Sequence, residues 1–258
     1  MGILNLTPDS FYDGGRYNDP AQALNKAEVL VTEGTDILDL GAYSSRPGAD
    51  HISEKEELER LIPVVKAIIK EFPSAFLSID TFRSAVARAA INEGAHIIND
   101  ISAGALDEKM FSTVAELRAP YILMHMRGTP QTMAQQTDYE DITTEVSFYF
   151  ASKISQLKEL GVKDLVIDPG FGFAKTPEQS FSLLKNLDYL KITGHPVLAG
   201  LSRKSMIYKT LTTDADNALN GTIAANTIAL MKGANILRVH DVKAARDAIT
   251  IFEKVVNL

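Results

Sequence analysis

The chain has 258 residues, with 26 lysines and arginines against 33 aspartates and glutamates, and a formal net charge of −7 at pH 7. An acidic chain without a basic block is poorly suited to neutralise a phosphate backbone, which argues against nucleic acid as a partner. The absence of cysteine excludes disulfides, thiolate nucleophiles and cysteine-ligated metals. No stretch approaches the roughly 18 apolar residues of a membrane span, and no secretory signal precedes the first strand. We therefore expect a soluble, cytoplasmic protein without a membrane partner.

Eight short apolar runs predict strands that are buried on both faces. These runs are Met1–Asn5, Ile37–Leu40, Phe76–Asp80, Ile97–Asp100, Tyr121–His125, Leu165–Asp168, Val197–Leu201 and Ile236–Val239. Longer amphipathic stretches predict helices over Pro20–Glu33, Ser53–Phe72, Ser84–Glu93, Glu108–Leu117, Glu140–Leu160, Pro177–Leu190, Ala215–Lys232 and Val242–Val256. A glycine follows five of them, where a left-handed residue ends a helix: Gly34, Gly94, Gly161, Gly194 and Gly233.

Strands that alternate with helices in this way predict a single-domain (β/α)8 TIM barrel over residues 1–258. The alternative is a doubly wound open sheet. That fold would need a glycine-rich phosphate turn after its first strand or a clear half-repeat, and neither is visible.

Polar residues follow nearly every predicted strand, at the rim where barrel enzymes assemble their sites. One such residue is normally a turn former, but a full rim of them indicates a site. Side chains alternate along a strand, so one member of each alternating set must face the barrel mouth. Candidates for the mouth include Asn5, Asp80, Asn99, Asp168, Lys204, Arg238 and His240.

The polar groups Asp80, Asn99, Asp168 and Lys204 suit a flat heterocycle. A carboxylate accepts two parallel N–H bonds, and a 2-amino-4-oxo ring edge offers that pair of donors. Apolar side chains could pack on the ring faces, and the candidates are Met124, Phe171 and Phe173. A guanine-like or pterin-like ring is the expected ligand. The alternative is a purely structural ion pair, such as Asp168 with Lys204.

A second cluster is basic and contains Arg46, Arg238 and His240. Arginine binds phosphate through two parallel bonds, and the spacing of Arg238 and His240 places both on one strand face. Residues 202–205 lie where a helix should begin, and helix N-termini bind anions. This cluster predicts an anion site beside the heterocycle, although Arg46 alone would be read as a solvated loop charge.

Eight motifs, in order along essentially the whole chain, resemble the dihydropteroate synthase family. They are Met1–Phe11 with Asp13–Gly15, Asp36–Gly41 with Ser45–Ala49, Ser78–Thr81, Ile98–Asp100, Met124–Gly128, Asp168–Phe173, Gly200–Ser205 and Arg238–Asp241. The chain shows two departures from the family pattern. Tyr12 replaces a small residue, and Tyr43–Ser45 stands where Glu-Ser-Thr is frequent.

The resemblance implies a reaction in which 7,8-dihydropterin-6-ylmethyl diphosphate and 4-aminobenzoate give 7,8-dihydropteroate and diphosphate, with Mg²⁺ as cofactor and a homodimer as the assembly. It implies that the pterin is bound by Asp80, Asn99, Met124, Asp168, Phe173, Gly200 and Lys204. It assigns the diphosphate to Asn5, Arg46, Arg238 and His240, with Mg²⁺ at Asn5. It places 4-aminobenzoate beside Ser45, Pro47, Phe173 and Ser205. Catalysis would depend on Arg46, Asp80, Lys204 and Arg238.

We expect a dissociative, cation-like step, because an arylamine is already neutral at pH 7 and needs positioning more than deprotonation. The loops after the first two strands carry Asp9, Asp13 and Arg46, and we expect them to be mobile and to close over both ligands. Three alternatives share parts of the pattern. These are a corrinoid-linked pterin methyltransferase, a sugar-phosphate aldolase with Lys204 as Schiff base, and a pterin-binding protein without catalysis.

Overall fold

The structure is a computed structural model and describes residues 1–6, 20–44 and 51–256. Its strands are β1 (Gly2–Asn5), β2 (Ile37–Gly41), β3 (Phe76–Asp80), β4 (Ile97–Asp100), β5 (Tyr121–Met124), β6 (Leu165–Asp168), β7 (Leu198–Ala199) and β8 (Ile236–Leu237). Its helices are α1 (Pro20–Thr32), α2 (Glu54–Glu71), α3 (Ser84–Asn92), α4 (Met110–Leu117), α5 (Ile142–Glu159), α6 (Pro177–Lys185), α7 (Ser205–Thr210), α8 (Leu219–Met231) and α9 (Val242–Val256). Two 3₁₀ helices are η2 (Met133–Gln135) and η3 (Leu187–Thr193).

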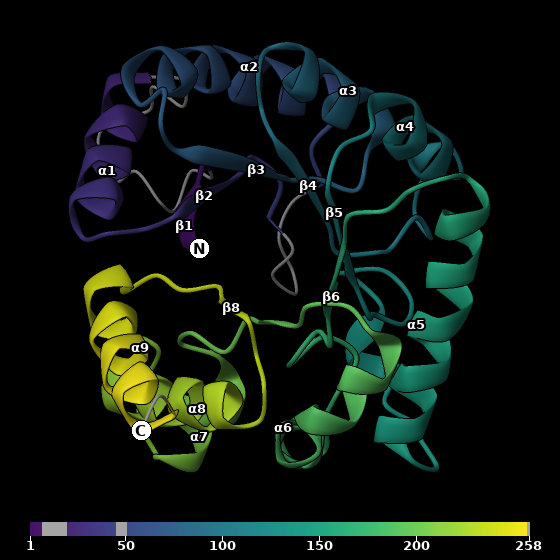
Figure 1. The fold of residues 1–258 in the computed structure, drawn as a ribbon, viewed down its shortest axis with the longest axis vertical. Helices are drawn as coiled ribbons and strands as arrows, with labels where there is room; N and C mark the ends of the chain where they lie inside the picture. The colour runs from purple at the N-terminus through teal and green to yellow at the C-terminus, as the bar shows by residue number, and fades with distance from the viewer. Residues whose placement is uncertain (7–19, 45–50, 257–258) are drawn as a thin grey trace.

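The strands close into a parallel barrel. β1 to β6 pair in chain order, β7 pairs with β8, and the bridge between Ile167 and Val197 joins the two groups. The barrel closes where Gly2 bridges to Val239, and Ile3 N donates to Val239 O over 2.9 Å. The helices form a ring around the strands (Figure 1). The predicted (β/α)8 barrel is confirmed, because an open sheet would leave β1 and β8 apart.

The helix ends follow from local sequence. Ser53 accepts a hydrogen bond from Glu56 N at the start of α2, and Thr176 and Gln179 form a capping box at the start of α6. The five glycines predicted to end helices all have positive φ angles, for example +82° at Gly161. No helix in the described part of the chain is long and apolar enough to cross a bilayer.

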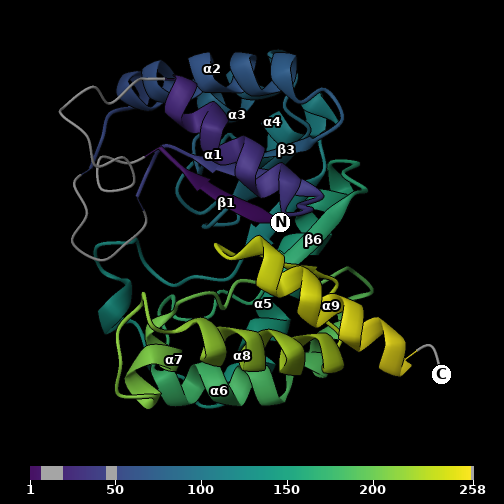
Figure 2. The same cartoon turned by 90° about the vertical axis from the view of Figure 1, so that its left-hand side faces the viewer.

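Two helix predictions were wrong in detail. The single helix expected over Pro177–Leu190 ends at Lys185 and is followed by η3, because the chain tightens into a 3₁₀ segment there. The helix expected over Ala215–Lys232 begins only at Leu219. The expected start of a helix within residues 202–205 agrees with α7, which begins at Ser205 and has six residues. In Figure 2, α6, α7 and α8 lie together on the side of the barrel opposite α2, α3 and α4.

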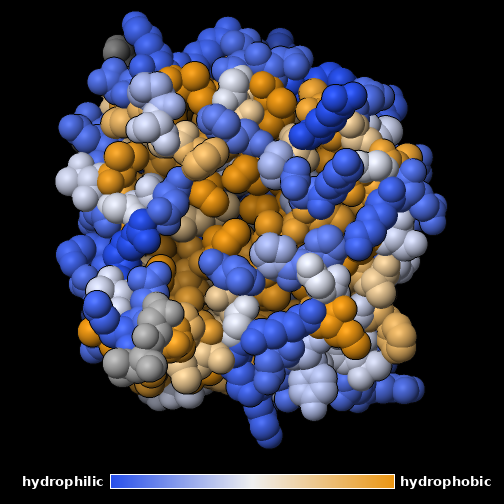
Figure 3. Space-filling model, viewed as in Figure 1, coloured by the Kyte–Doolittle hydropathy of each residue, from blue (hydrophilic) through white to orange (hydrophobic). Residues whose placement is uncertain are grey.

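The two ends of the barrel differ in chemistry. Apolar side chains fill the end where the strands begin, including Met1, Ile37, Ile122, Leu198 and Ile236. Figure 3 shows this face, which is hollowed and apolar at its centre. The polar strand-end residues gather at the other end of the barrel, which therefore holds the candidate site. The loops expected to be mobile fall within residues 7–19 and 45–50, outside the described residues.

Candidate active site

Four polar side chains meet at the barrel mouth, three from β2, β3 and β4 and one from the residue just after β8. Arg238 donates from Nε to Asp39 Oδ2 over 2.6 Å and from Nη2 to Asp80 Oδ2 over 2.7 Å. Asn99 donates from Nδ2 to the same oxygen of Asp39 over 3.1 Å. Burial raises the pKa of Asp80, while the nearby Arg238 acts in the opposite direction. The result is a polar floor, meaning Asp39, Asp80, Asn99 and Arg238, with donors and acceptors for a flat ring.

Asp39 is the floor residue that the sequence analysis passed over. Its side chain is fully buried, at 0% exposure, and its second oxygen, Oδ1, has no hydrogen-bond partner among the described residues. A buried carboxylate oxygen without a donor is costly, and such atoms mark places where a ligand or water donates. A signal was available, because an acid inside the apolar strand Ile37–Leu40 is seldom buried without a partner.

Asp168 and Lys204 complete the ring of polar groups, but they do not form a direct ion pair. Asp168 Oδ1 accepts from Gly170 N over 2.8 Å. Lys204 Nζ donates to Phe171 O and lies 4.4 Å from the centre of the Phe173 ring. Burial lowers the pKa of Lys204 to about 8, against the opposing effect of Asp168. The structural ion pair considered for these two residues is therefore absent, and both groups keep capacity for a ligand.

Gly200 lies beside Asp168 at the barrel mouth. A Cβ atom at this position would come within 3.9 Å of Asp168 Oδ2, which is ordinary van der Waals contact.

An apolar wall lies beside the floor and contains Met124 and Phe173, the two residues expected against the ring faces. Its other members come from the loops at the same rim: Tyr43, Ile52, Phe82, Ile101, Leu106, Met126, Met133 and Ala174. Tyr43, one of the departures from the family pattern, accepts a hydrogen bond from Gln131 Nε2 over 3.1 Å. It thereby connects the loops after β2 and β5. Flat apolar faces beside polar edge groups are what an aromatic heterocycle needs.

The residues expected at the diphosphate lie at one side of this mouth. Arg238 uses Nε and Nη2 on the floor carboxylates, so Nη1 has no hydrogen-bond partner in the described ranges. Burial, reinforced by Arg238 and Arg203, lowers the pKa of His240 to about 4, so its imidazole is neutral at pH 7. Ser205 is the first residue of α7. A helix of six residues has a small dipole, so the expected anion binding by its N-terminus has little support.

Three predicted residues cannot be located relative to this mouth. Ser45, Arg46 and Pro47 lie outside the described residues. Their expected contacts with diphosphate and 4-aminobenzoate stay predictions.

Two other polar strand-end residues turn away from the mouth. Asp100 accepts from Ser102, Gly104 and Tyr121 and so fixes its own loop. His125 lies just beyond β5, which ends at Met124 rather than at His125 as predicted.

Lys175 is a second residue that the sequence analysis missed. Its buried amino group lies 2.9 Å from His125 Nδ1 and donates to Gly170 O over 3.0 Å and to Phe173 O over 2.9 Å. Burial, with Lys175 close by, lowers the pKa of His125 to about 2, so this imidazole is neutral and its Nδ1 can accept. Lys175 thus ties the end of β5 to the loop that presents Phe173 to the mouth. Sequence position gave no signal for this role.

Asn5 is suitable for a Mg²⁺ site in which the protein supplies only one ligand. It ends β1 opposite Gly41, and its side chain makes no hydrogen bond to any residue that the structure describes. No cluster of three or more acidic or histidine ligands occurs among residues 1–6, 20–44 and 51–256. Mg²⁺ commonly keeps several waters and takes one or two protein oxygens plus substrate phosphates. The amide oxygen of Asn5 is suitable as such a single ligand.

Comparisons with known proteins agree with this geometry. The pterin-binding enzyme family matches residues 1–240. A dihydropteroate synthase of Synechocystis sp. is 46% identical over 247 residues, which cover 95% of this chain and 85% of that protein. The Yersinia pestis dihydropteroate synthase, solved with a sulfonamide drug complex, superposes with a TM-score of 0.94 at 40% identity and covers 100% of this chain and 94% of that one.

The Xanthomonas albilineans dihydropteroate synthase, solved with 4-aminobenzoic acid, gives a TM-score of 0.93 at 40% identity. The match covers 100% of this chain and 93% of that one. Family, sequence and structure thus agree over nearly the full length. This chain belongs to the pterin-binding enzyme family and, within it, to the dihydropteroate synthases.

Proposed function

We propose that this chain condenses 7,8-dihydropterin-6-ylmethyl diphosphate with 4-aminobenzoate, releasing 7,8-dihydropteroate and diphosphate. Membership of the dihydropteroate synthases supports the reaction. The observation that carries the pterin assignment is the polar floor, in which a buried carboxylate oxygen of Asp39 lacks a donor. A 2-amino-4-oxo ring brings the N–H donors that such a floor requires.

In this proposal the ring lies between the polar floor and the apolar wall. Asn99 and Asp168 bind its polar edge, and Lys204 donates to a ring oxygen or nitrogen. Met124 and Phe173 pack against the ring, and Gly200 leaves space for it. The support is geometric: Asn99 and Asp168 are buried and Lys204 stands over Phe173.

The diphosphate leaving group is bound on the other side of the mouth. Arg238 is held by two carboxylates, which fixes its guanidinium while Nη1 stays available for a diphosphate oxygen. His240, Asn5 and Arg46 are assigned to the same anion. Asn5 would hold Mg²⁺, and a divalent cation there would neutralise charge that develops on the leaving oxygens.

Asp39 and Asp80 also stabilise the positive charge that forms on the pterin. As the carbon–oxygen bond to diphosphate breaks, positive charge develops on the pterin, and the two carboxylates lie at the floor beneath it. The neutral arylamine nitrogen then bonds to the methylene carbon that diphosphate has left, and the proton lost from this nitrogen passes to solvent. Ser45, Pro47, Phe173 and Ser205 are assigned to holding 4-aminobenzoate in line for this step.

The decisive assay measures diphosphate release from the pterin diphosphate, with and without 4-aminobenzoate and Mg²⁺. We expect release that depends on the amine, together with stoichiometric dihydropteroate. Release without any amine dependence, or none at all, would refute the proposal. Borohydride trapping with a keto substrate is the control for the aldolase alternative, and we expect no labelling of Lys204.

The proposed assembly is a homodimer of single-domain chains, formed through α8. Buried residues such as Ala225 and Ala229 face the barrel, yet Ile228 and Met231 on the same helix are exposed. Lys232, just after α8, donates to Asp188 of η3 over 3.4 Å, so η3 contacts the C-terminal end of α8, and Tyr189 of η3 is also exposed. Ile192 is 85% exposed, and an apolar surface of this kind is typical of an interface.

Sedimentation velocity tests the homodimer. Ile228→Glu with Met231→Glu should convert the dimer to monomers, and Ile251→Glu, at an exposed apolar position on α9, should not. A monomeric wild type at micromolar concentration would refute the assembly.

A further inference from the structure

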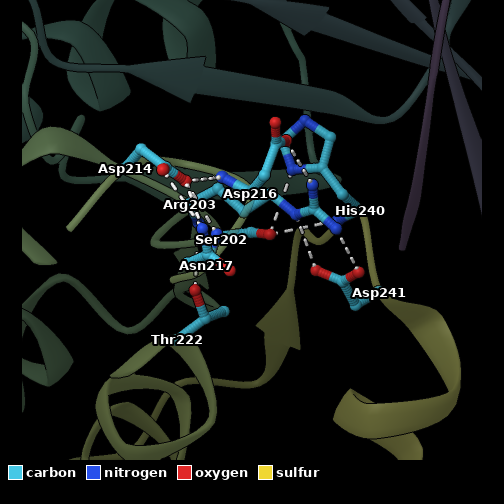
Figure 4. Close-up of polar contacts among 8 residues, drawn as sticks. All are labelled: Ser202, Arg203, Asp214, Asp216, Asn217, Thr222, His240 and Asp241. Atoms are coloured by element: carbon cyan, nitrogen blue, oxygen red, sulfur yellow. Dashed lines mark hydrogen bonds and ion pairs between the residues drawn. The ribbon is translucent and has the colours of Figure 1, made fainter. Parts of the chain in front are cut away.

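The pairing of β7 with β8 continues beyond the strands through side chains. Leu198 pairs with Ile236 and Ala199 with Leu237 in the parallel ladder. Ser202 then contacts His240, and Arg203 contacts Asp241, with the same sequence separation of 38 residues. Figure 4 shows these two contacts next to each other, connecting the loop after β7 to the loop after β8. These two contacts therefore fix the position of the loop after β7 relative to the loop after β8 at the barrel mouth.

Among the described residues, the Ser202 hydroxyl makes two hydrogen bonds, both to His240. Its oxygen accepts from His240 N over 3.2 Å and lies 3.0 Å from His240 Nδ1. A serine hydroxyl has one hydrogen to donate. If that hydrogen is donated to Nδ1, both bonds are satisfied and the imidazole proton must reside on Nε2.

The opposite assignment is less favourable. If Nδ1 carried the proton, Ser202 Oγ would accept two bonds and its own hydrogen would have no acceptor among the described residues. Ser202 is only 6% exposed, so solvent would not easily compensate. A buried donor without an acceptor is costly, so the first tautomer is favoured.

We propose that Ser202 is a positioning residue that holds His240 as its Nε2–H tautomer, so that a neutral imidazole offers an N–H donor to the diphosphate. Which anion is bound rests on the proposed function, but the tautomer itself does not. The hydrogen bond made by one ring nitrogen generally determines the proton on the other.

The groups around His240 keep its imidazole neutral, so the tautomer decides whether the ring can donate a hydrogen bond to an anion. Burial, Arg238 and Arg203 keep His240 neutral, whereas Asp241 acts in the opposite direction and Lys26 adds a further positive group nearby. A neutral ring presents either an N–H or a lone pair to its neighbour. A lone pair on Nε2 would repel an anion, so anion binding without prior protonation requires the tautomer that Ser202 selects.

Arg203 supplies a matched control because it holds the same two loops without touching the imidazole. Its Nε and Nη2 donate to Asp241 over 3.0 and 2.7 Å, and its backbone N donates to Thr222 Oγ1 over 3.1 Å. Arg203→Lys removes the two-pronged contact with Asp241 and leaves the Ser202 hydroxyl in place. If Ser202 served only to hold the two loops together, Arg203→Lys and Ser202→Ala should have similar effects on diphosphate binding. If Ser202 sets the tautomer of His240, only Ser202→Ala should change that tautomer.

The test is long-range ¹⁵N–¹H correlation NMR on the full chain labelled with ¹⁵N-histidine. The sequence has five histidines, so His240→Gln identifies the His240 signals. We expect an Nε2–H pattern in the wild type and in Ser202→Thr, which keeps the hydroxyl. We expect Ser202→Ala to shift the population towards Nδ1–H, with Arg203→Lys unchanged in tautomer.

Inorganic diphosphate is the functional probe, read as its inhibition constant. Ser202→Ala should raise that constant about tenfold, a loss typical of one hydrogen bond to a charged group, and Ser202→Thr should restore it. An Nδ1–H pattern in the wild type, an unchanged tautomer in Ser202→Ala, or an unchanged inhibition constant would each overturn the proposal. Failure of the proposed function would appear separately, as a wild type without amine-dependent diphosphate release.

Discussion

Arg238 and Asp39 are 199 positions apart in the chain, yet Arg238 Nε donates to Asp39 Oδ2 over 2.6 Å. The pair joins β8 to β2 across the mouth of the closed barrel, and the same guanidinium also reaches Asp80. Asp39, which was not among the predicted site residues, therefore orients Arg238, which was predicted to bind the diphosphate.

Asp39→Asn tests this arrangement. The change keeps the shape of the side chain and removes the charge that orients Arg238, so kcat/KM for the pterin diphosphate should fall about 30- to 100-fold, as when one partner of a buried charge pair is removed. Asp36→Asn is the matched control, because Asp36 pairs with Arg246 on the surface. Steady-state kinetics with both variants decide the matter, and wild-type turnover by Asp39→Asn would contradict the role.

The pH dependence of substrate capture should reveal Lys204. Burial lowers its pKa to about 8, so the ammonium that donates to the pterin is present below that pH and lost above it. We expect kcat/KM for the pterin diphosphate to fall as pH rises through about 8, since this ratio reports ionisations of the free enzyme. Lys204→Arg should keep its charge and move this limb to higher pH. A flat wild-type profile between pH 7 and 9 would argue against Lys204 as a charged donor.

Lys175→Met should destabilise the fold while leaving the mouth residues in place. It removes the donor for Gly170 O and Phe173 O, and it leaves His125 Nδ1 without its neighbour. We expect the free energy of unfolding to drop by about 2–4 kcal/mol, because several buried acceptors lose their donor. Urea denaturation measures the change, with Lys185→Met on the exposed face of α6 as control. Equal midpoints for the two variants would show that Lys175 is not a structural tie.

Gly170→Ala and Gly161→Ala separate backbone strain from collision. Both glycines have positive φ, +67° and +82°, so each substitution carries the left-handed penalty of about 1–2 kcal/mol. Only at position 170 would the new Cβ meet a backbone atom, His125 O, at 2.1 Å, whereas nothing lies within 4 Å at position 161. Thermal unfolding should therefore place Gly170→Ala well below Gly161→Ala. Matching melting temperatures would refute the close approach.

Asn5→Ala tests whether Asn5 is a ligand of Mg²⁺. If Asn5 supplies the protein oxygen for Mg²⁺, half-maximal diphosphate release should require roughly tenfold more Mg²⁺, the lower end of what altered ligation typically costs. Turnover at saturating pterin and aminobenzoate, titrated with MgCl₂, measures the shift. An unaltered Mg²⁺ dependence would remove Asn5 from the metal site.

The sequence predicted the barrel and the strands well, because buried parallel strands are nearly continuous apolar runs and their ends share one rim. It did not predict the division of α6 from η3, since the apolar spacing continues through both segments. An acid within the apolar strand Ile37–Leu40 does indicate that Asp39 needs a partner, but it does not indicate which strand supplies that partner, and so the contact with Arg238 was missed. It missed Lys175 because the contacts of that residue are backbone carbonyls, which have no residue-specific signature.

Closure of the barrel by β1 and β8 has a consequence for synthesis of the protein. Asp39, Asp80 and Asn99 are synthesised well before Arg238, so a growing chain carries three of the four floor residues without the cation that balances the two acids. Asp39 and Asp80 would repel one another until Arg238 arrives. We therefore expect ligand binding only after β8 and Arg238 have been made, and a chain released before β8 should be an easy substrate for proteases rather than a competitor for pterin.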